Sequence, residues 1–159
     1  MQLKLNIKKA LICFTWAYII VTILAYALSI TAGIVFKLPS AQELGVSMFE
    51  DPAFVMTVPY HLLLNLLVWT FFSYRYFKKK ENNQYFLKEA LNLSGCWLVV
   101  AMIVDYIGFV LIKSPISLTP HQFYVEYQPW ISITYLIVFI SPLLWCGIVK
   151  YRSIYFAKG

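Results

Sequence analysis

Asp105 is the residue whose type and position most need a chemical explanation. It is the one charged residue in a long apolar segment that covers about residues 90–112. A carboxylate near the middle of a bilayer costs about 2.5–3.5 kcal/mol on insertion scales. Such a group is expected to face other helices, to have a polar partner and to mark a functional site. We therefore start the search for a site at Asp105.

A polar face on the preceding apolar segment supplies candidate partners. Thr57, His61 and Asn65 recur every four residues, and this spacing places them on one side of a helix. This segment enters the membrane near residue 54 and the next one leaves it near residue 112. His61 and Asp105 then both lie about seven residues, or ~10 Å, below the same boundary, and Asn65 lies about one turn deeper. The sequence predicts that His61 and Asp105 meet at equal depth on adjacent helices.

Three interpretations of these two residues remain open. They could form a buried pair that fixes helix register. They could line an outward-facing cavity for a small ligand, a proton or an ion. His61 could also be a general base that Asp105 orients, acting on a lipid or lipid-linked substrate from the outer leaflet. The leading expectation is a membrane protein that binds or passes a small ligand or ion, or is a subunit of a larger assembly. The alternative is an intramembrane enzyme with His61 and Asp105 as catalytic residues.

Two residues of the last connection, His121 and Glu126, could close over such a site. Together with His61 and Asp105 they offer nitrogen and oxygen ligands, but their spacing matches no metal motif. The chain also contains no phosphate-binding loop, zinc-protease or nucleophile-elbow motif. We therefore expect neither a metal nor a cofactor. The candidate ligand-binding residues are Thr57, His61, Asn65, Asp105, His121 and Glu126.

Four membrane-spanning helices must position these residues. The chain has 159 residues, of which 61% are hydrophobic and 13% charged, whereas a soluble domain carries about 25% charged residues. This composition excludes a disordered chain, a nucleic-acid-binding domain and a typical cytosolic enzyme. Spans that can cross about 30 Å of hydrocarbon are expected at about residues 10–36, 53–77, 90–112 and 130–149. We expect one all-α integral membrane domain, a four-helix bundle over residues 1–159.

Basic residues flank these spans unevenly. Of the 13 Lys and Arg residues, 11 lie on the side shared by both termini and the second connection, and only Lys37 and Lys113 lie on the other. The positive-inside rule therefore places both termini in the cytoplasm, and we expect the plasma membrane. A basic cluster next to the second span is expected to contact anionic lipids of the inner leaflet, at about 1 kcal/mol per residue. The cluster consists of Arg75, Lys78, Lys79 and Lys80.

The first connection contains a helix-start signal. Ser40 and Glu43 have the spacing of a capping box, which predicts a short helix over about residues 41–49. This helix is expected on the outer membrane surface. Because four spans make a small bundle, we also expect any pore to require a homo-oligomer or a partner membrane subunit.

Overall fold

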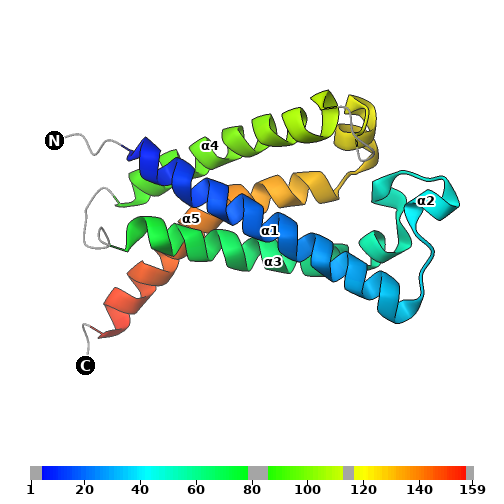
Figure 1. Ribbon diagram of the computed structural model, residues 1–159. Helices are drawn as coiled ribbons and strands as arrows, with labels where there is room; N and C mark the ends of the chain where they lie inside the picture. Colours follow the sequence, from blue (N-terminus) through cyan, green and yellow to red (C-terminus); the bar gives the residue numbers. More distant parts are fainter. Residues whose placement is uncertain (1–4, 79–85, 113–116, 157–159) are drawn as a thin grey trace.

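The computed structural model describes residues 5–78, 86–112 and 117–156. Its four long helices run back and forth along one bundle (Figure 1). They are α1 (Ile7–Phe36), α3 (Pro52–Phe77), α4 (Phe86–Asp105) and α5 (Trp130–Phe156). Four shorter elements accompany them: α2 (Ala41–Leu44), the 3-10 turn η1 (Met48–Glu50), and the π-helical segments η2 (Tyr106–Leu111) and η3 (Gln122–Glu126).

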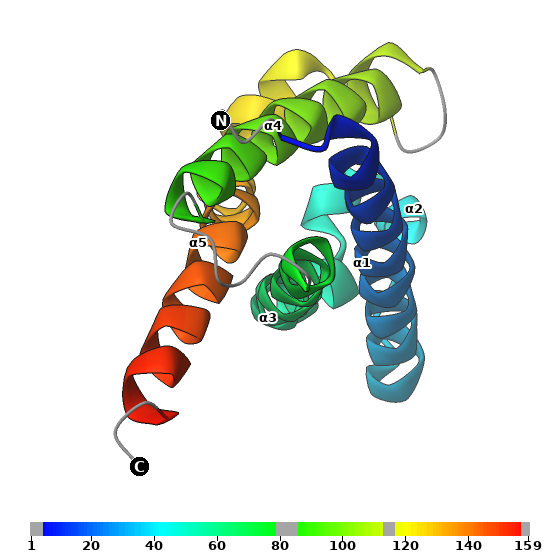
Figure 2. The ribbon, with the colours of Figure 1, turned by 90° about the vertical axis from the view of Figure 1, so that its left-hand side faces the viewer.

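The long helices surround a central space in the order α1, α3, α5, α4. Extensive contacts join α1 to α3, α3 to α5 and α5 to α4, and a smaller contact joins α4 to α1. Viewed along the bundle, α3 and α4 therefore lie diagonally opposite each other (Figure 2). Both chain ends lie at one end of the bundle, which we call the terminal end. The connection containing α2 lies at the other, which we call the α2 end (Figure 1).

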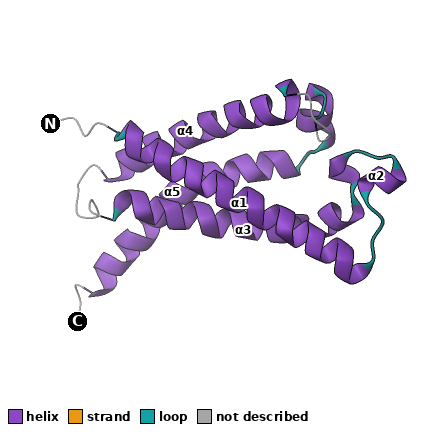
Figure 3. Ribbon diagram, in the orientation of Figure 1, coloured by secondary structure: helices purple, strands orange, loops and turns teal. Residues whose placement is uncertain are grey.

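All four long helices have the length and apolar composition needed to cross a membrane, and α4 reaches this length together with η2. Within the described residues the structure contains no strand (Figure 3). Large apolar side chains such as Ile23, Leu67 and Val99 are more than half exposed on the outside of the bundle, at 60%, 59% and 55%. That surface suits hydrocarbon rather than water. The expected all-helical fold with four long apolar helices is confirmed, and it fits a multi-pass membrane protein.

Capping side chains set where the long helices begin. The Asn6 side chain accepts a hydrogen bond from the Lys9 N–H at 3.0 Å, so α1 begins at Ile7 rather than at residue 10. Asp51 accepts from the N–H groups of Ala53 and Phe54 at 2.9 and 3.0 Å, and α3 begins at Pro52. Proline suits the first helical turn because its missing N–H has no partner there anyway. The end of α5 differs from the prediction, because this helix continues to Phe156, past the end expected at residue 149.

The connection between α1 and α3 contains the expected capping box but a shorter helix. The Ser40 hydroxyl accepts from the Glu43 N–H at 3.3 Å, and the Ser40 N–H donates to the Glu43 carboxylate at 2.7 Å. The helix ends at Leu44 because Gly45 adopts a left-handed conformation, with φ at +66°. A 3-10 turn follows at Met48. Two short segments therefore replace the single helix expected over residues 41–49.

The larger of the two clusters of buried apolar residues lies toward the terminal end. The rings of Phe14 and Trp97 each lie 5.3 Å from that of Trp69, measured between centroids. The Trp97 indole N–H donates to the Ala10 carbonyl at 3.0 Å, and this bond ties α4 to α1. A smaller apolar cluster at the α2 end contains Val110, Leu118, Phe123 and Ile131. The space between the two clusters holds the candidate site.

Candidate functional site

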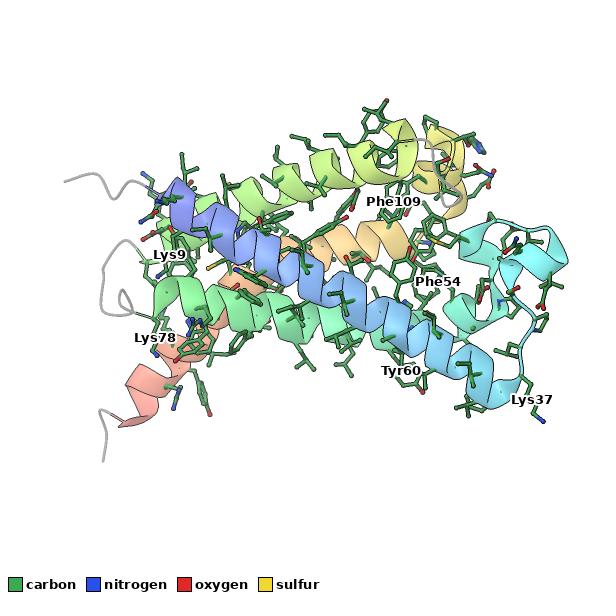
Figure 4. The ribbon with its side chains drawn as sticks, viewed as in Figure 1. Lys9, Lys37, Phe54, Tyr60, Lys78 and Phe109 are labelled. Carbon is green, nitrogen blue, oxygen red and sulfur yellow. The ribbon has the colours of Figure 1, made fainter. Side chains whose placement is uncertain are left out.

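A cavity of about 570 Å³ lies inside the bundle, on the α2 side of Trp69. All four long helices and the α1–α3 connection contribute to its wall. Figure 4 shows the Phe54 and Phe109 side chains in the space between the helices, and both residues line the cavity. Small-molecule sites typically measure about 300–1,000 Å³ and are mostly apolar. The aromatic residues of the wall are Tyr18, Tyr26, Phe49, Phe54, Trp69, Phe109, Phe123, Tyr127 and Tyr135.

Three of the predicted site residues lie in this wall. His61 and Asn65 come from α3 and Asp105 comes from the end of α4. Their relative exposures are only 7%, 7% and 8%. Buried polar groups need hydrogen-bond partners, so their partners determine what each can offer to a ligand.

Asp105 receives its hydrogen bond from α1. The Tyr18 hydroxyl donates to Asp105 Oδ1 at 2.6 Å. The Tyr135 hydroxyl of α5 lies close enough to interact electrostatically with the carboxylate. That hydroxyl is buried and has no hydrogen-bond partner of regular geometry among the described residues. No Lys, Arg or His within the described ranges forms an ion pair with Asp105.

His61 is connected to a short chain of hydroxyl groups. Its Nε2 lies 3.1 Å from Ser29 Oγ, and Ser29 Oγ lies 2.9 Å from Thr57 Oγ1. Thr57 Oγ1 also lies 2.8 and 3.0 Å from the carbonyl oxygens of Ala53 and Phe54 in its own helix. The ring nitrogen donates to or accepts from Ser29 according to the tautomer of His61, and the ring also interacts with the Ala25 carbonyl of α1.

The predicted direct contact between His61 and Asp105 is not present. Each residue instead bonds to a side chain of α1, Ser29 for His61 and Tyr18 for Asp105. The reason is that α3 and α4 lie diagonally across the bundle, so equal depth does not make the two residues neighbours. Neither α1 partner was predicted from the sequence. A signal for them exists, because Tyr18, Thr22 and Ser29 recur at helical spacing on one face of the first span.

Asn65 and Thr57 support the site from within α3. The Asn65 amide donates to the His61 carbonyl at 2.9 Å, and its oxygen accepts from the Trp69 indole N–H at 3.1 Å. Asn65 therefore orients the Trp69 ring, which bounds the cavity on the side of the terminal end. Thr57 is buried behind His61 and is not part of the cavity wall.

His121 and Glu126 lie away from the cavity. His121 Nδ1 is 3.0 Å from Glu126 Oε1, and the two side chains are 69% and 56% exposed. They pair with each other on the surface of the α4–α5 connection rather than closing over the site. Among the described residues, no group of three or more His, Cys, Asp or Glu side chains could hold a metal ion.

An aromatic stack joins the two connections at the α2 end. The rings of Phe49 and Tyr127 are parallel within 8°, with centroids 3.8 Å apart. Both residues line the cavity. Burial raises the pKa of the Tyr127 hydroxyl, so this phenol stays neutral at physiological pH.

The arrangement is better suited to binding than to nucleophilic catalysis. Ser29 and His61 are within the distance range of a nucleophile and its base. A nucleophile and its base also need a third group that orients the base. No carboxylate within the described residues orients the His61 ring, because Asp105 bonds to Tyr18.

Comparisons with protein-family models, with curated proteins and with solved structures find no match to this chain. Its function is therefore inferred from the cavity and from the membrane-spanning architecture.

Proposed function

We propose that this chain is a multi-pass membrane protein that binds a small, largely apolar ligand in its central cavity. The supporting observation is the cavity of about 570 Å³, whose aromatic and aliphatic wall contains a few buried polar groups, among them His61 and Asp105. That combination is typical of ligand sites, in which apolar surface supplies affinity and a few polar groups fix orientation. Asp105, whose carboxylate has acceptor capacity beyond the Tyr18 bond, is a group that a ligand could satisfy.

The exposed rim of the cavity favours entry from lipid. Tyr26, Ile30 and Ile34 line the cavity and are also 40%, 60% and 73% exposed on α1. Residues that belong to both surfaces mark an opening, and the outside of α1 is expected to lie in hydrocarbon. Toward the terminal end, Trp69 and Trp97 fill the bundle. Binding a ligand from the membrane therefore fits the geometry better than passing an ion through the bundle.

We further propose that both termini are cytoplasmic and that the protein lies in the plasma membrane. Lys9 and Lys78 lie at the terminal end and Lys37 lies at the α2 end (Figure 4), in agreement with the positive-inside rule. The cavity is then in the outer half of the membrane.

The basic cluster remains a proposed contact with anionic lipids of the inner leaflet. Arg75 and Lys78 are exposed at the terminal end, whereas Lys79 and Lys80 lie outside the described residues. Assembly with a second copy or a partner subunit is also a proposal, which the small size of the bundle supports.

Photolabelling tests the ligand site directly. The protein in lipid nanodiscs is irradiated with a decanol analogue that carries a diazirine, and adducts are mapped by mass spectrometry. We expect adducts on wall residues such as Phe109 and Ile131, and excess decanol should prevent them. The Ala25→Trp substitution fills the cavity and should abolish competable labelling, whereas Ala27→Trp, on the exposed face of the same helix, should not.

One labelling pattern would contradict the proposed ligand site. If labelling follows general lipid exposure, with adducts on residues such as Ile23 and Leu67 that decanol does not suppress, the cavity is not a ligand site.

A further inference from the structure

The charged groups of the cavity wall have one sign. The wall contains no Lys or Arg among the described residues, and its carboxylates are Asp51 and Asp105. Asp51 already accepts backbone N–H bonds from Ala53 and Phe54 on one oxygen and from Ala41 on the other, at 2.8–3.0 Å. Asp105 is therefore the acid that can serve a ligand.

Asp105 has acceptor capacity left. A carboxylate offers about four lone-pair sites, and the Tyr18 hydroxyl uses one of them. The nearby Tyr135 hydroxyl is buried and interacts with the carboxylate and with Tyr124, but with no regular hydrogen-bond geometry among the described residues. A ligand donor placed between the two could bond to the carboxylate and to this phenol oxygen.

The surrounding rings favour a cation over an anion. Tyr18, Trp69, Phe109 and Tyr135 share the wall with Asp105, and aromatic faces attract ammonium groups. His61 adds no positive charge in its neutral form. A ligand carboxylate would instead find no basic residue among the described residues of the wall to offset its charge.

We infer that the ligand is a hydrophobic organic amine, with its ammonium group at Asp105 and its apolar body between Phe54 and Phe109. This inference rests on the proposed ligand-binding function. It adds the chemical class of the ligand that the residues of the cavity wall favour. A charge-assisted hydrogen bond to a buried carboxylate provides the preference for an amine over a neutral analogue of the same shape.

Equilibrium dialysis with three matched probes tests this class. The probes are 2-naphthylmethylamine, 2-naphthylmethanol and 2-naphthoate, and the protein is in nanodiscs of zwitterionic lipid, with empty nanodiscs measuring partitioning. We expect the amine to bind about tenfold more tightly than the alcohol, and naphthoate to show no saturable binding. Asp105→Asn should remove the advantage of the amine. The control Glu43→Gln, also a carboxylate-to-amide change, should keep it, because a capping box accepts Gln.

The outcomes separate the two proposals. Equal affinities of wild-type protein for amine and alcohol, or saturable binding of naphthoate, overturn the amine inference while leaving ligand binding in place. An Asp105→Asn variant that keeps the preference for the amine also overturns it. If no probe binds saturably to the wild-type protein, the proposed ligand-binding function itself fails. The comparison of probes on wild-type protein does not depend on whether the Asp105→Asn variant folds.

Discussion

The two tyrosine hydroxyls beside Asp105 are not equivalent, and this difference can be measured. Tyr18 donates to the carboxylate at 2.6 Å, whereas the Tyr135 hydroxyl interacts with the carboxylate and with Tyr124 without regular hydrogen-bond geometry among the described residues. Removing a donor from a buried charged acceptor costs about 1–3 kcal/mol. We therefore expect Tyr18→Phe to lower the free energy of unfolding by that amount, and Tyr135→Phe to change it by less than about 0.5 kcal/mol. Reversible SDS unfolding of the purified protein measures both, and equal losses would contradict the assigned hydrogen bond.

At this scale the sequence predicted which residues face inward but not what they touch. The energetic cost of a carboxylate in lipid was sufficient to predict that Asp105 is buried, and helical spacing placed His61 and Asn65 on one face. Their partners Tyr18 and Ser29 depend on which helices are neighbours. Hydropathy gives the depth of a residue in the membrane, but it does not give the order of the helices around the bundle.

Among the short elements, the 3-10 turn η1 is capped by the titratable carboxylate of Glu50. The Ser47 hydroxyl and backbone N–H donate to the Glu50 carboxylate at 2.7 and 3.0 Å and hold the pKa of Glu50 below its ordinary value. This interaction therefore stabilises the turn above the unfolded pKa and is lost as the pH falls through the folded pKa. Ser47→Ala should raise the pKa of Glu50, and Ser47→Thr should keep it low. Carboxyl carbon NMR titration measures the pKa, and an unchanged value in Ser47→Ala would contradict the cap.

Gly45 and Gly147 provide a matched pair of glycine positions. Gly45 has a φ of +66° and Gly147 is inside α5, and a Cβ at either position meets no atom within 4 Å. Backbone conformation alone therefore separates them. Gly45→Ala should cost about 1–2 kcal/mol because of left-handed strain, whereas Gly147→Ala should be neutral or stabilising by up to about 1 kcal/mol. Thermal unfolding of the two variants in nanodiscs measures the difference, and the opposite order would contradict the turn at Gly45.

The long helices were predictable as elements, and the irregular segments were not. Apolar length placed most ends of the long helices within a few residues, and the Ser40 capping box placed the start of α2. The break at Gly45 overrode a helical pattern of apolar residues. The π-helical turn after Asp105 includes a bond from the Ile112 N–H to the Ile107 carbonyl at 3.0 Å. A local change in hydrogen-bond register of this kind depends on packing and has no simple sequence pattern.

For the whole molecule, the charge distribution predicts the orientation in the membrane. Lys37 and Lys78 lie at opposite ends of the bundle (Figure 4). In intact cells, a membrane-impermeant maleimide should label a Lys37→Cys variant and should label Lys78→Cys only after the membrane is permeabilised. Of the three natural cysteines, Cys13 and Cys146 are buried and Cys96 is half-buried, and wild-type protein gives the background. Labelling of Lys78→Cys alone in intact cells would reverse the proposed orientation and place the cavity in the inner half of the membrane.

The central claim, a ligand held at Asp105 inside the bundle, can be tested by one spectroscopic measurement. The chain has only two aspartates, Asp51 and Asp105, so protein with carbon-13 in its aspartate carboxyl groups gives two signals, and the Asp105→Asn variant assigns them. On titration with 2-naphthylmethylamine in nanodiscs, we predict a saturable shift of the Asp105 signal and a much smaller change at Asp51, whose oxygens are held by backbone N–H groups. An Asp105 signal that does not move, or that only drifts in proportion to the added amine together with Asp51, would contradict the account.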